Sequence, residues 1–281
     1  PRRRRRQIRR NRRHLAAQPG WRDPEFARDP LSANLRALAF HIRRAKEISN
    51  GGIIGVNIMC ALTHYEEYVR CCIENGADLI ISGAGLPTDL PKYTAGSSIK
   101  LAPIVSPPRT AKVLLKLWDN HYHRVPDLVV IEGPAAGGHL AIPPKPWKKQ
   151  HGAATMTKSG KFCRLYMATK KNMPVPSRRL CRSVYTHEDI LHYLSLGCAG
   201  VQMATRFVVT EECDADPRYK QAYLNAKKKI SRSCTVRSHA GPRNPQSVSD
   251  GTRTGTGKIS HCYQCLKNAT KPPFPTVLPL P

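Results

Sequence analysis

The stretch Val129–Leu140, which reads VVIEGPAAGGHL, combines an acid, a glycine-rich turn and a histidine. Its apolar run ends at Glu132, and the turn leads to His139. Because small residues leave the backbone accessible, a flat or phosphorylated ligand can approach such a turn closely. A histidine beside that ligand can exchange a proton with it near neutral pH. This order of residues predicts a catalytic loop at the carboxyl end of a barrel strand, with His139 as the titratable group.

The elements that must position this loop alternate along the chain. The helical periodicity of apolar residues predicts helices at 32–49, 63–74, 109–120, 187–196 and 217–226, the first with Ser32 as its N-cap. Short apolar runs predict strands at 53–59, 78–82, 101–106, 128–131 and 199–203. Such alternation is typical of a parallel sheet covered by helices. A chain of 281 residues has room for a (β/α)8 TIM barrel, which needs about 250.

The net charge of +27 suggests a nucleic-acid-binding protein, but this charge is confined to three segments. Residues 1–14 contain nine arginines, residues 143–182 contain eleven lysines and arginines, and neither segment contains an acid. Residues 227–281 are also basic, whereas the patterned remainder of the chain is nearly neutral. None of the three segments has a sustained hydrophobic period. We therefore hypothesise that they do not come from the selected reading frame, which translation of the gene's other two frames tests.

This distribution predicts one folded domain with atypical flanks. Residues 1–14 form a basic, disordered end, and residues 15–230 form a barrel domain. The segment 143–182 interrupts that domain as an aberrant, insert-like stretch, and residues 231–281 form a disordered tail. Arginines in 1–14 would contact phosphates without specificity, because no aromatic residue is present there to stack on bases.

The cysteines and the hydropathy pattern favour a cytoplasmic protein. Ten cysteines are scattered without a disulfide framework, and Cys71 and Cys72 adjoin each other inside a helical pattern. No apolar run reaches the roughly 18 residues of a membrane span, so we expect no membrane contact. Cys262 and Cys265 form a CxxC pair next to His261, but no second pair lies at zinc-site spacing. We therefore expect no metal.

Several blocks of the chain are similar to one enzyme family. They cover about a third of the chain in family order and read QPGWRDPEF with DPLSANLRA (18–37), IIGVNIM (53–59), DLIISGAGLP (78–87), APIVS (102–106), DLVVIEGPAAGGHL (127–140), YTHEDI (185–190) and GCAGVQMATRFVVTEECDA (197–215). On these blocks the chain resembles the nitronate monooxygenases, also called 2-nitropropane dioxygenases. The resemblance implies a (β/α)8 barrel that binds FMN at the carboxyl ends of its strands.

The resemblance also implies roles for individual residues. Asn57 corresponds to the asparagine that contacts the flavin, and Gly137, Gly138 and His139 correspond to the active-site glycines and the histidine proposed as base or hydrogen-bond donor. The loop that holds the FMN phosphate corresponds to Gln202, Met203, Ala204 and Thr205. Backbone N–H groups and a hydroxyl at a strand-to-helix junction suit a phosphate. The alternatives are that His139 only satisfies a carbonyl, that Asn57 caps the next turn, and that Gln202 and Thr205 are polar residues at a sheet end.

Two positions depart from the family pattern. The family begins with a strand and a glycine-rich loop that line the flavin, where residues 1–14 offer mainly arginines, so we expect an incomplete or distorted barrel without this first strand. The family's penultimate strand ends in Ala-Gly-Gly, where this chain has Cys181, Arg182 and Ser183. A glycine allows a close backbone approach to a phosphate, whereas Arg182 would meet it by charge.

These observations lead to one main hypothesis and three alternatives. The main hypothesis is an FMN-dependent oxidoreductase that uses O2 to convert a small alkyl nitronate into a carbonyl compound and nitrite. The alternative within enzymes is the related FMN-dependent enoyl-acyl-carrier-protein reductase, which needs a nicotinamide donor. The alternatives of another class are a basic nucleic-acid-binding protein and a non-functional, frameshifted product. The sequence does not determine the oligomeric state.

Overall fold

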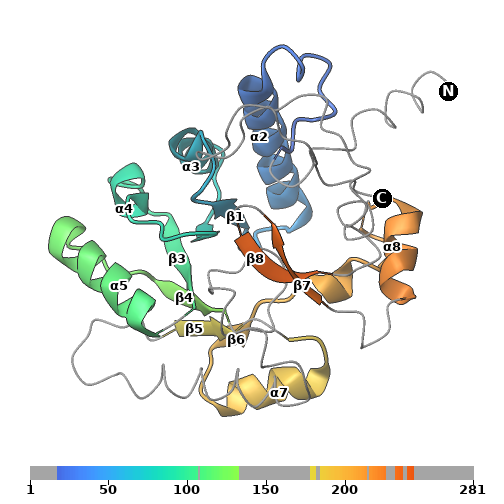
Figure 1. Cartoon of the computed structure of the whole chain (residues 1–281). Helices are drawn as coiled ribbons and strands as arrows, with labels where there is room; N and C mark the ends of the chain where they lie inside the picture. Colours follow the sequence, from blue (N-terminus) through green and yellow to red (C-terminus); the bar gives the residue numbers. More distant parts are fainter. Residues whose placement is uncertain are drawn as a thin grey trace, which may run out of the picture.

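The computed structural model describes residues 18–106, 108–132, 178–181, 184–213, 215–225, 232–236 and 239–243. Within these ranges, helices surround an arc of strands that is open on one side (Figure 1). The strands of the larger sheet are β1 (Gly55–Met59), β2 (Leu79–Gly83), β3 (Lys100–Val105), β4 (Leu128–Ile131), β5 (Arg178–Cys181) and β6 (Gly200–Val201). The helices are α2 (Pro30–Ile48), α3 (Tyr65–Glu74), α4 (Leu90–Tyr93), α5 (Pro108–Tyr122), α7 (His187–Ser195) and α8 (Pro217–Leu224), with the 3-10 helix η4 (Thr205–Phe207).

The six strands of the larger sheet pair in parallel and in sequence order, β1-β2-β3-β4-β5-β6. Parallel neighbours that follow one another along the chain, with helices between them, have the strand order of a (β/α)8 barrel. The predicted α/β fold class is therefore confirmed. Among the described residues the sheet has six strands, with β1 and β6 at its edges, which agrees with an incomplete barrel.

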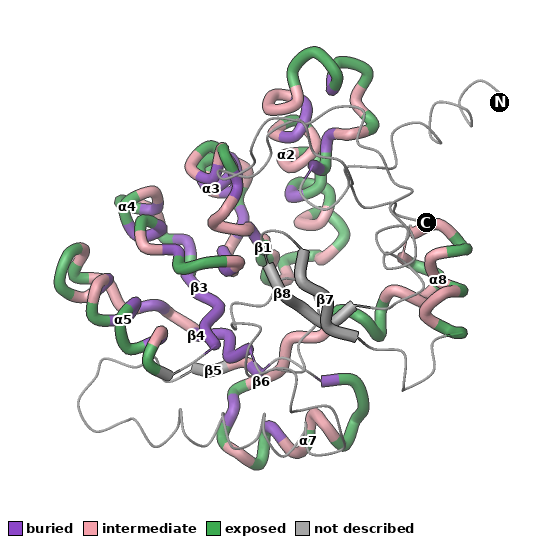
Figure 2. The backbone as a smooth tube through the Cα atoms, viewed as in Figure 1, coloured by how far each residue is buried: buried purple, intermediate pink, exposed green. Residues whose placement is uncertain are grey.

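The two faces of this sheet pack against different partners. The outer face contributes Ile80, Leu101, Val105 and Val129 to a core shared with the covering helices, which includes the fully buried Trp118 of α5. The inner face carries a second cluster of Ala102, Ile104 and Val130, flanked by Leu79, Ile81, Leu128 and Leu180. Figure 2 shows β3 and β4, in the middle of the sheet, as continuously buried strands. Because both faces are covered, the strands are apolar runs rather than alternating sequences.

The ends of the helices show which polar residues begin them. Asp29, not the predicted Ser32, is the N-cap of α2, because the Asp29 carboxylate accepts the Ser32 backbone N–H at 3.1 Å. Thr186 caps α7 in a capping box, in which Asp189 accepts the backbone N–H of Thr186. The predicted strands and helices lie within a few residues of the observed ones, and α4 is an additional short helix that the periodicity does not predict.

Two aspartates fix the register at the amino ends of the strands. Asp78, which precedes β2, accepts the backbone N–H of Ile54 at 2.7 Å and the Lys46 ammonium at 2.9 Å. Asp127, which precedes β4, accepts the backbone N–H of Leu101 at 3.0 Å. In both places the side-chain carboxylate accepts a backbone N–H from the preceding strand or the residue before it, which adds one hydrogen bond to the pairing of the two strands. These charge-assisted bonds oppose a slip of the register.

Regular structure also occurs in two segments that the composition marks as atypical. Residues 178–181, at the end of the segment 143–182, form β5 and pair directly with β4, so no further strand lies between these two. In the tail, β7 (Arg232–Val236) and β8 (His239–Arg243) form a two-stranded antiparallel sheet. Backbone pairing occurs in these ten residues despite their polar composition, and the predicted division of the chain into a barrel domain and a tail from residue 231 stays a prediction. The expected disorder of residues 1–14 lies outside the described residues, as does the rest of both segments.

None of the helices in the described ranges has the length and the apolar character that a membrane span requires.

We expect Asp78→Asn to lower the free energy of unfolding by about 1 kcal/mol at neutral pH, because the Ile54 N–H and the Lys46 ammonium lose a charged acceptor. These two donors hold the pKa of Asp78 below its ordinary value. Its contribution is therefore complete above the pKa of the unfolded chain and is lost as the pH falls through the folded value. Denaturant titrations from neutral to acidic pH should show the difference from the wild type shrinking. Glu47→Gln, which removes an exposed ion pair with Arg44, is the control with almost no effect.

Candidate functional site

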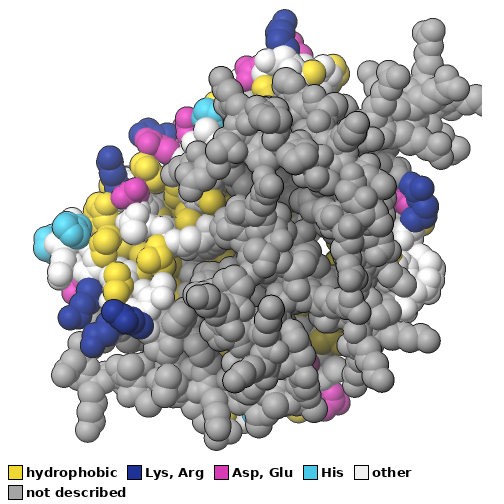
Figure 3. Space-filling view, in the orientation of Figure 1, with side chains coloured by type: hydrophobic (Ala, Val, Ile, Leu, Met, Phe, Trp, Pro, Cys, Tyr) yellow, Lys and Arg dark blue, Asp and Glu magenta, His cyan; other side chains and the backbone are white. Residues whose placement is uncertain are grey.

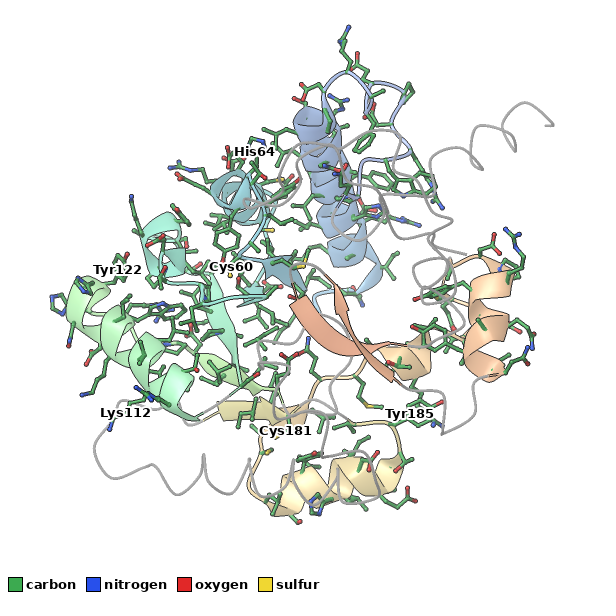
Figure 4. All side chains as sticks on the ribbon, in the orientation of Figure 1. Cys60, His64, Lys112, Tyr122, Cys181 and Tyr185 are labelled. Carbon is green, nitrogen blue, oxygen red and sulfur yellow. The ribbon has the colours of Figure 1, made fainter. Side chains whose placement is uncertain are left out.

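The carboxyl ends of the parallel strands form one edge of the sheet, which we call the carboxyl rim. It consists of the last residue of each strand and the residues that follow, and it includes Cys60, Ser82 to Gly85, Ser106, Glu132, Cys181 and Gln202. In barrels of this strand order, the loops at this end form the active site. Cys60 and Cys181 mark the ends of β1 and β5 in Figure 4.

Asn57 lies in β1 on the inner face of the sheet. In the register of the sheet it pairs with Ile81, which pairs in turn with Ala102 of the inner apolar cluster. The Asn57 side chain is exposed, unlike the next residue, Ile58, which is 4% exposed and belongs to the outer core. An exposed amide beside an apolar surface can bind a polar group of a flat ligand that lies on that surface. Its position agrees with the predicted ligand contact.

A hydrogen-bond chain holds the rim ends of β1 and β2 together. The Ser82 hydroxyl donates to the Ile58 carbonyl at 2.9 Å, and the Tyr65 hydroxyl bonds to the Ser82 oxygen at 2.7 Å. Because the proton of Ser82 is engaged by the carbonyl, Tyr65 is the donor. Burial raises the pKa of Tyr65 far above its ordinary value, so the phenol stays neutral. Tyr65 and Tyr68 are both buried and pack in the core between the sheet and the helices.

The turn after β2 depends on small residues. A Cβ at Gly83 would lie 2.8 Å from the Cβ of Ile104 in the inner cluster. Gly85 has φ +128°, and a Cβ there would lie 2.9 Å from the Cys60 sulfur. Ala84 between them has φ 57°. Side chains at the two glycine positions would collide with Ile104 or with Cys60 after β1, so the turn passes this close to the neighbouring strands only with glycine at both positions.

Ser106 and Glu132 form a buried polar pair at the rim ends of β3 and β4. Ser106 is 0% exposed and Glu132 is 2% exposed. The Ser106 hydroxyl donates to a Glu132 carboxylate oxygen at 3.5 Å, and the Glu132 backbone N–H donates to the Val105 carbonyl at 2.8 Å. No binding or catalytic role was predicted for Ser106 or Glu132 from the sequence, although Glu132 ends the apolar run before the predicted catalytic loop. The sequence signal of this pair is a polar residue directly after each of two buried apolar runs.

The ends of β5 and β6 are joined at the predicted phosphate loop. The Gln202 backbone N–H donates to the Cys181 carbonyl at 2.8 Å. The Gln202 side-chain oxygen is buried, and no group in the described ranges bonds to it. Met203 is half-buried, Ala204 and Thr205 are exposed, and Thr205 begins η4. The Arg206 guanidinium donates to the Tyr185 carbonyl at 3.3 Å and lies over the Tyr185 ring (labelled in Figure 4), which connects the loop to the segment before α7.

Some of the predicted site residues lie in the described ranges and others do not. Asn57 lies in β1 and Gln202 to Thr205 follow β6, so these residues lie at the two edge strands of the sheet (Figure 1). Gly137, Gly138 and His139 lie outside the described residues, as do Arg182 and Ser183. The structure therefore describes the predicted site at β1 and at the loop after β6, which are the two edges of the sheet.

These residues fit a flavin in two respects. The buried, unpartnered amide oxygen of Gln202 can accept a hydrogen bond, and its amide nitrogen can donate one, from the loop predicted to hold the phosphate. The Asn57 amide is exposed on the inner face of β1, at the opposite edge of the sheet, and can bond to a polar group of the ring system. Among the described residues, no group of three or more histidines, cysteines or acids could hold a metal ion.

The charges on the outer helices are mixed rather than uniformly basic. Figure 3 shows Lys and Arg side chains interspersed with Asp, Glu and His on the outer helices of the viewed face. Several are paired, including Arg36 with Asp23 at 2.8 Å and Arg70 with Glu66 at 2.6 Å. A continuous basic surface, which a nucleic-acid-binding protein would need, is not formed by the helices of the described ranges.

We expect Ser106→Ala to lower the free energy of unfolding by about 1–2 kcal/mol, because the buried Glu132 carboxylate loses a donor that water cannot replace. In the background of Glu132→Gln the same substitution should cost less, so a double-mutant cycle in denaturant should give a coupling energy of about 0.5 kcal/mol or more. Ser195→Ala, which removes an exposed hydroxyl bonded to the His192 carbonyl, is the control and should change stability little. Additive effects at Ser106 and Glu132 would contradict the pairing.

Three solved structures superpose on this arrangement of strands and helices. Nitroalkane oxidase from Streptomyces ansochromogenes superposes with a TM-score of 0.57 at 12% identity, over 75% of this chain and 66% of that one. FabK from Thermotoga maritima gives a TM-score of 0.56 at 21% identity, over 73% of this chain and 59% of that one. The enoyl reductase domain of MlnA from Bacillus amyloliquefaciens gives 0.52 at 15% identity, over 73% and 52%. The chain thus spans about three fifths of the length of these proteins, and at these identities the likeness shows the fold.

No curated protein sequence matches the chain. The profile of one protein family, described as nitronate monooxygenase, matches residues 26–241, which is most of the chain. The match includes every strand of the parallel sheet, both described edges of the site and the segment that contains His139. On this match the chain belongs to the nitronate monooxygenase family and is an oxidoreductase.

Proposed function

We propose that the chain binds FMN at the carboxyl rim and oxidises a small alkyl nitronate with O2 to a carbonyl compound and nitrite. Membership of the family supports an oxidoreductase. The observation that carries the cofactor assignment is the buried side-chain oxygen of Gln202, which the described residues leave without a hydrogen-bond partner. A native protein seldom buries a polar atom in this way unless a ligand or water completes the bond. A ligand at this position would lie beside the backbone of Met203, Ala204 and Thr205.

In this proposal, residues 15–230 are the FMN-binding domain, and the loop from Gln202 to Thr205 holds the phosphate. Thr205 is the first residue of η4. Its hydroxyl and the backbone N–H groups of the loop are suitable donors for a phosphate. Asn57 binds the ring system from the opposite edge, and Gly137 and Gly138 allow the ring to approach the backbone. Bound FMN supplies the redox chemistry, and the protein orients the substrate and excludes water.

His139 holds or moves the proton of the substrate. As the neutral imidazole it accepts the carbon-bound proton of a nitroalkane, and as a donor it hydrogen-bonds the oxygens of the nitro group. Either role suits a side chain that titrates near neutral pH. Monooxygenase chemistry is part of the same proposal. A cytoplasmic location is also part of it, because the cysteines are scattered and Cys71 and Cys72 are adjacent in α3, which does not suit a disulfide framework.

We expect the purified chain to absorb at roughly 450 nm after incubation with FMN and gel filtration, since this band belongs to the oxidised flavin. Gln202→Leu keeps the size of the side chain but removes both of its polar groups. It should raise the Kd for FMN about tenfold, because one buried hydrogen bond is lost. Tyr185→Phe is the control, since it keeps the ring beneath Arg206. Equal Kd values for Gln202→Leu and the wild type would contradict the assignment of this loop.

We expect His139→Ala to lower the rate of nitrite release from a neutral nitroalkane by about 100-fold or more, the usual contribution of a general base. The preformed nitronate has already lost its proton, so its oxidation should fall less. Comparison of the two substrates at equal FMN occupancy separates proton transfer from binding. Full activity of His139→Ala on both substrates would remove His139 from the mechanism.

The second candidate is an enoyl reductase, which the fold likeness to FabK and to the enoyl reductase domain of MlnA favours. It would place an enoyl thioester on the same rim and require a nicotinamide donor. Consumption of NADH with an enoyl thioester, without nitrite release from a nitronate, would favour this candidate. Nitrite release without NADH would favour the first.

A further inference from the structure

Two cysteines, one in a strand and one in the connection before the next strand, face each other between the sheet and α7. Cys181 is the last residue of β5, and Cys198 lies in the connection from α7 to β6. Their sulfur atoms are 3.0 Å apart. This separation is shorter than an ordinary contact between two sulfur atoms and longer than the roughly 2.05 Å of a disulfide bond. A movement of about 1 Å would therefore join them.

The surroundings hold the two sulfurs in this position. Cys181 is 2% exposed and Cys198 is 6% exposed, and both belong to the core between the sheet and the helices. Cys181 pairs with Val201 in the parallel register, and the Cys198 backbone N–H donates to the Tyr193 carbonyl at 3.2 Å. Figure 4 shows Cys181 between the β5–β6 edge of the sheet and α7. Because sheet and helix fix the two backbones independently, the short distance is a property of the fold.

We propose that Cys181 and Cys198 are an oxidation site that forms a reversible intramolecular disulfide with a two-electron oxidant such as a peroxide. The more exposed Cys198 thiol attacks the peroxide, its S–H and the O–O bond break, and a sulfenic acid and water form. Cys181 then attacks the Cys198 sulfur, so that the S–S bond forms and the S–O bond breaks. The hydroxyl leaves with the Cys181 proton as water. Two thiols are oxidised and one peroxide is reduced to two molecules of water.

The Cys181–Cys198 disulfide would cross-link the end of β5 to the connection between α7 and β6. It would close a loop between residues 17 positions apart, which contains all of α7. It would also anchor the residue whose carbonyl binds the Gln202 N–H, so oxidation would stiffen the start of the rim loop after β6. A cross-link of this span reduces the conformational freedom of the unfolded chain and stabilises the folded one.

The test is to treat the native chain with hydrogen peroxide, remove the peroxide, block the remaining thiols with N-ethylmaleimide in denaturant, digest without reductant and map the peptides by mass spectrometry. We expect one cross-linked species that joins the peptides of Cys181 and Cys198, is two hydrogen atoms lighter than their sum and disappears with dithiothreitol. The midpoint of thermal unfolding should rise by roughly 5 °C on oxidation. Neither readout involves a flavin or its chemistry, so a failure of the proposed function would leave this result unaffected.

Matched variants separate this pair from the other cysteines. Cys198→Ser should abolish both the cross-link and the shift of the midpoint, whereas Cys72→Ser, at an equally buried thiol in α3, should retain both. Peptide mapping of the wild type does not depend on whether these variants fold. The proposal is overturned if both thiols of the oxidised wild type are still fully alkylated, or if Cys198 accumulates as a sulfinic acid instead of a disulfide.

Discussion

The parallel, in-order pairing of β1 to β6 is the constraint on which the rest of the molecule depends. Because every strand runs in the same direction, every connecting loop after a strand emerges at the same end, and polar residues from distant parts of the sequence meet there. The pairing is fixed at the other end by Asp78 and Asp127, whose carboxylates continue the hydrogen bonding to the preceding strand. A slip of one residue would turn Asn57 into the helical core and Ile58 towards the inner face.

The two apolar faces of the sheet have different roles. The outer face packs against the helices, which contribute large buried side chains such as Trp118 and Leu114 of α5, so this core provides most of the burial that stabilises the chain. The inner face is smaller, and its cluster of Ala102, Ile104 and Val130 is bordered by Asn57 and by the glycine turn after β2. The two faces of the sheet are thus both packed, and the exposed amide of Asn57 lies at the border of the inner cluster.

Three features of the structure meet at the end of β5. The Cys181 carbonyl accepts the backbone N–H of Gln202, the first residue of the loop after β6. Its sulfur lies beside that of Cys198. A single residue therefore connects the strand pairing, the candidate phosphate loop and a pair of thiols, because the last residue of a central strand contacts both of its neighbours.

Much of this architecture could be predicted from the residues themselves. The strand 128–131 agrees with the observed β4, and the helix predicted at 187–196 differs from α7 by one residue, because both segments have clear apolar periods and sharp ends. The short helix α4 and the cap of α2 were not predicted, since Leu90–Tyr93 is too short to show a period and Asp29 and Ser32 are both good caps. The hairpin β7–β8 was not predicted either, because backbone pairing does not require an apolar sequence.

The sequence by itself determined the alternation of strands and helices, the family motifs and the residue types that can bind a flavin, because these are local patterns of a few neighbouring positions. Only the tertiary structure decided that Ser106 lies against Glu132, that Tyr65 bonds to Ser82, that the Gln202 oxygen is buried without a partner in the described ranges, and that Cys181 and Cys198 meet. Each of these depends on the relative placement of two elements. That placement follows from the register and curvature of the whole sheet, which no local pattern contains.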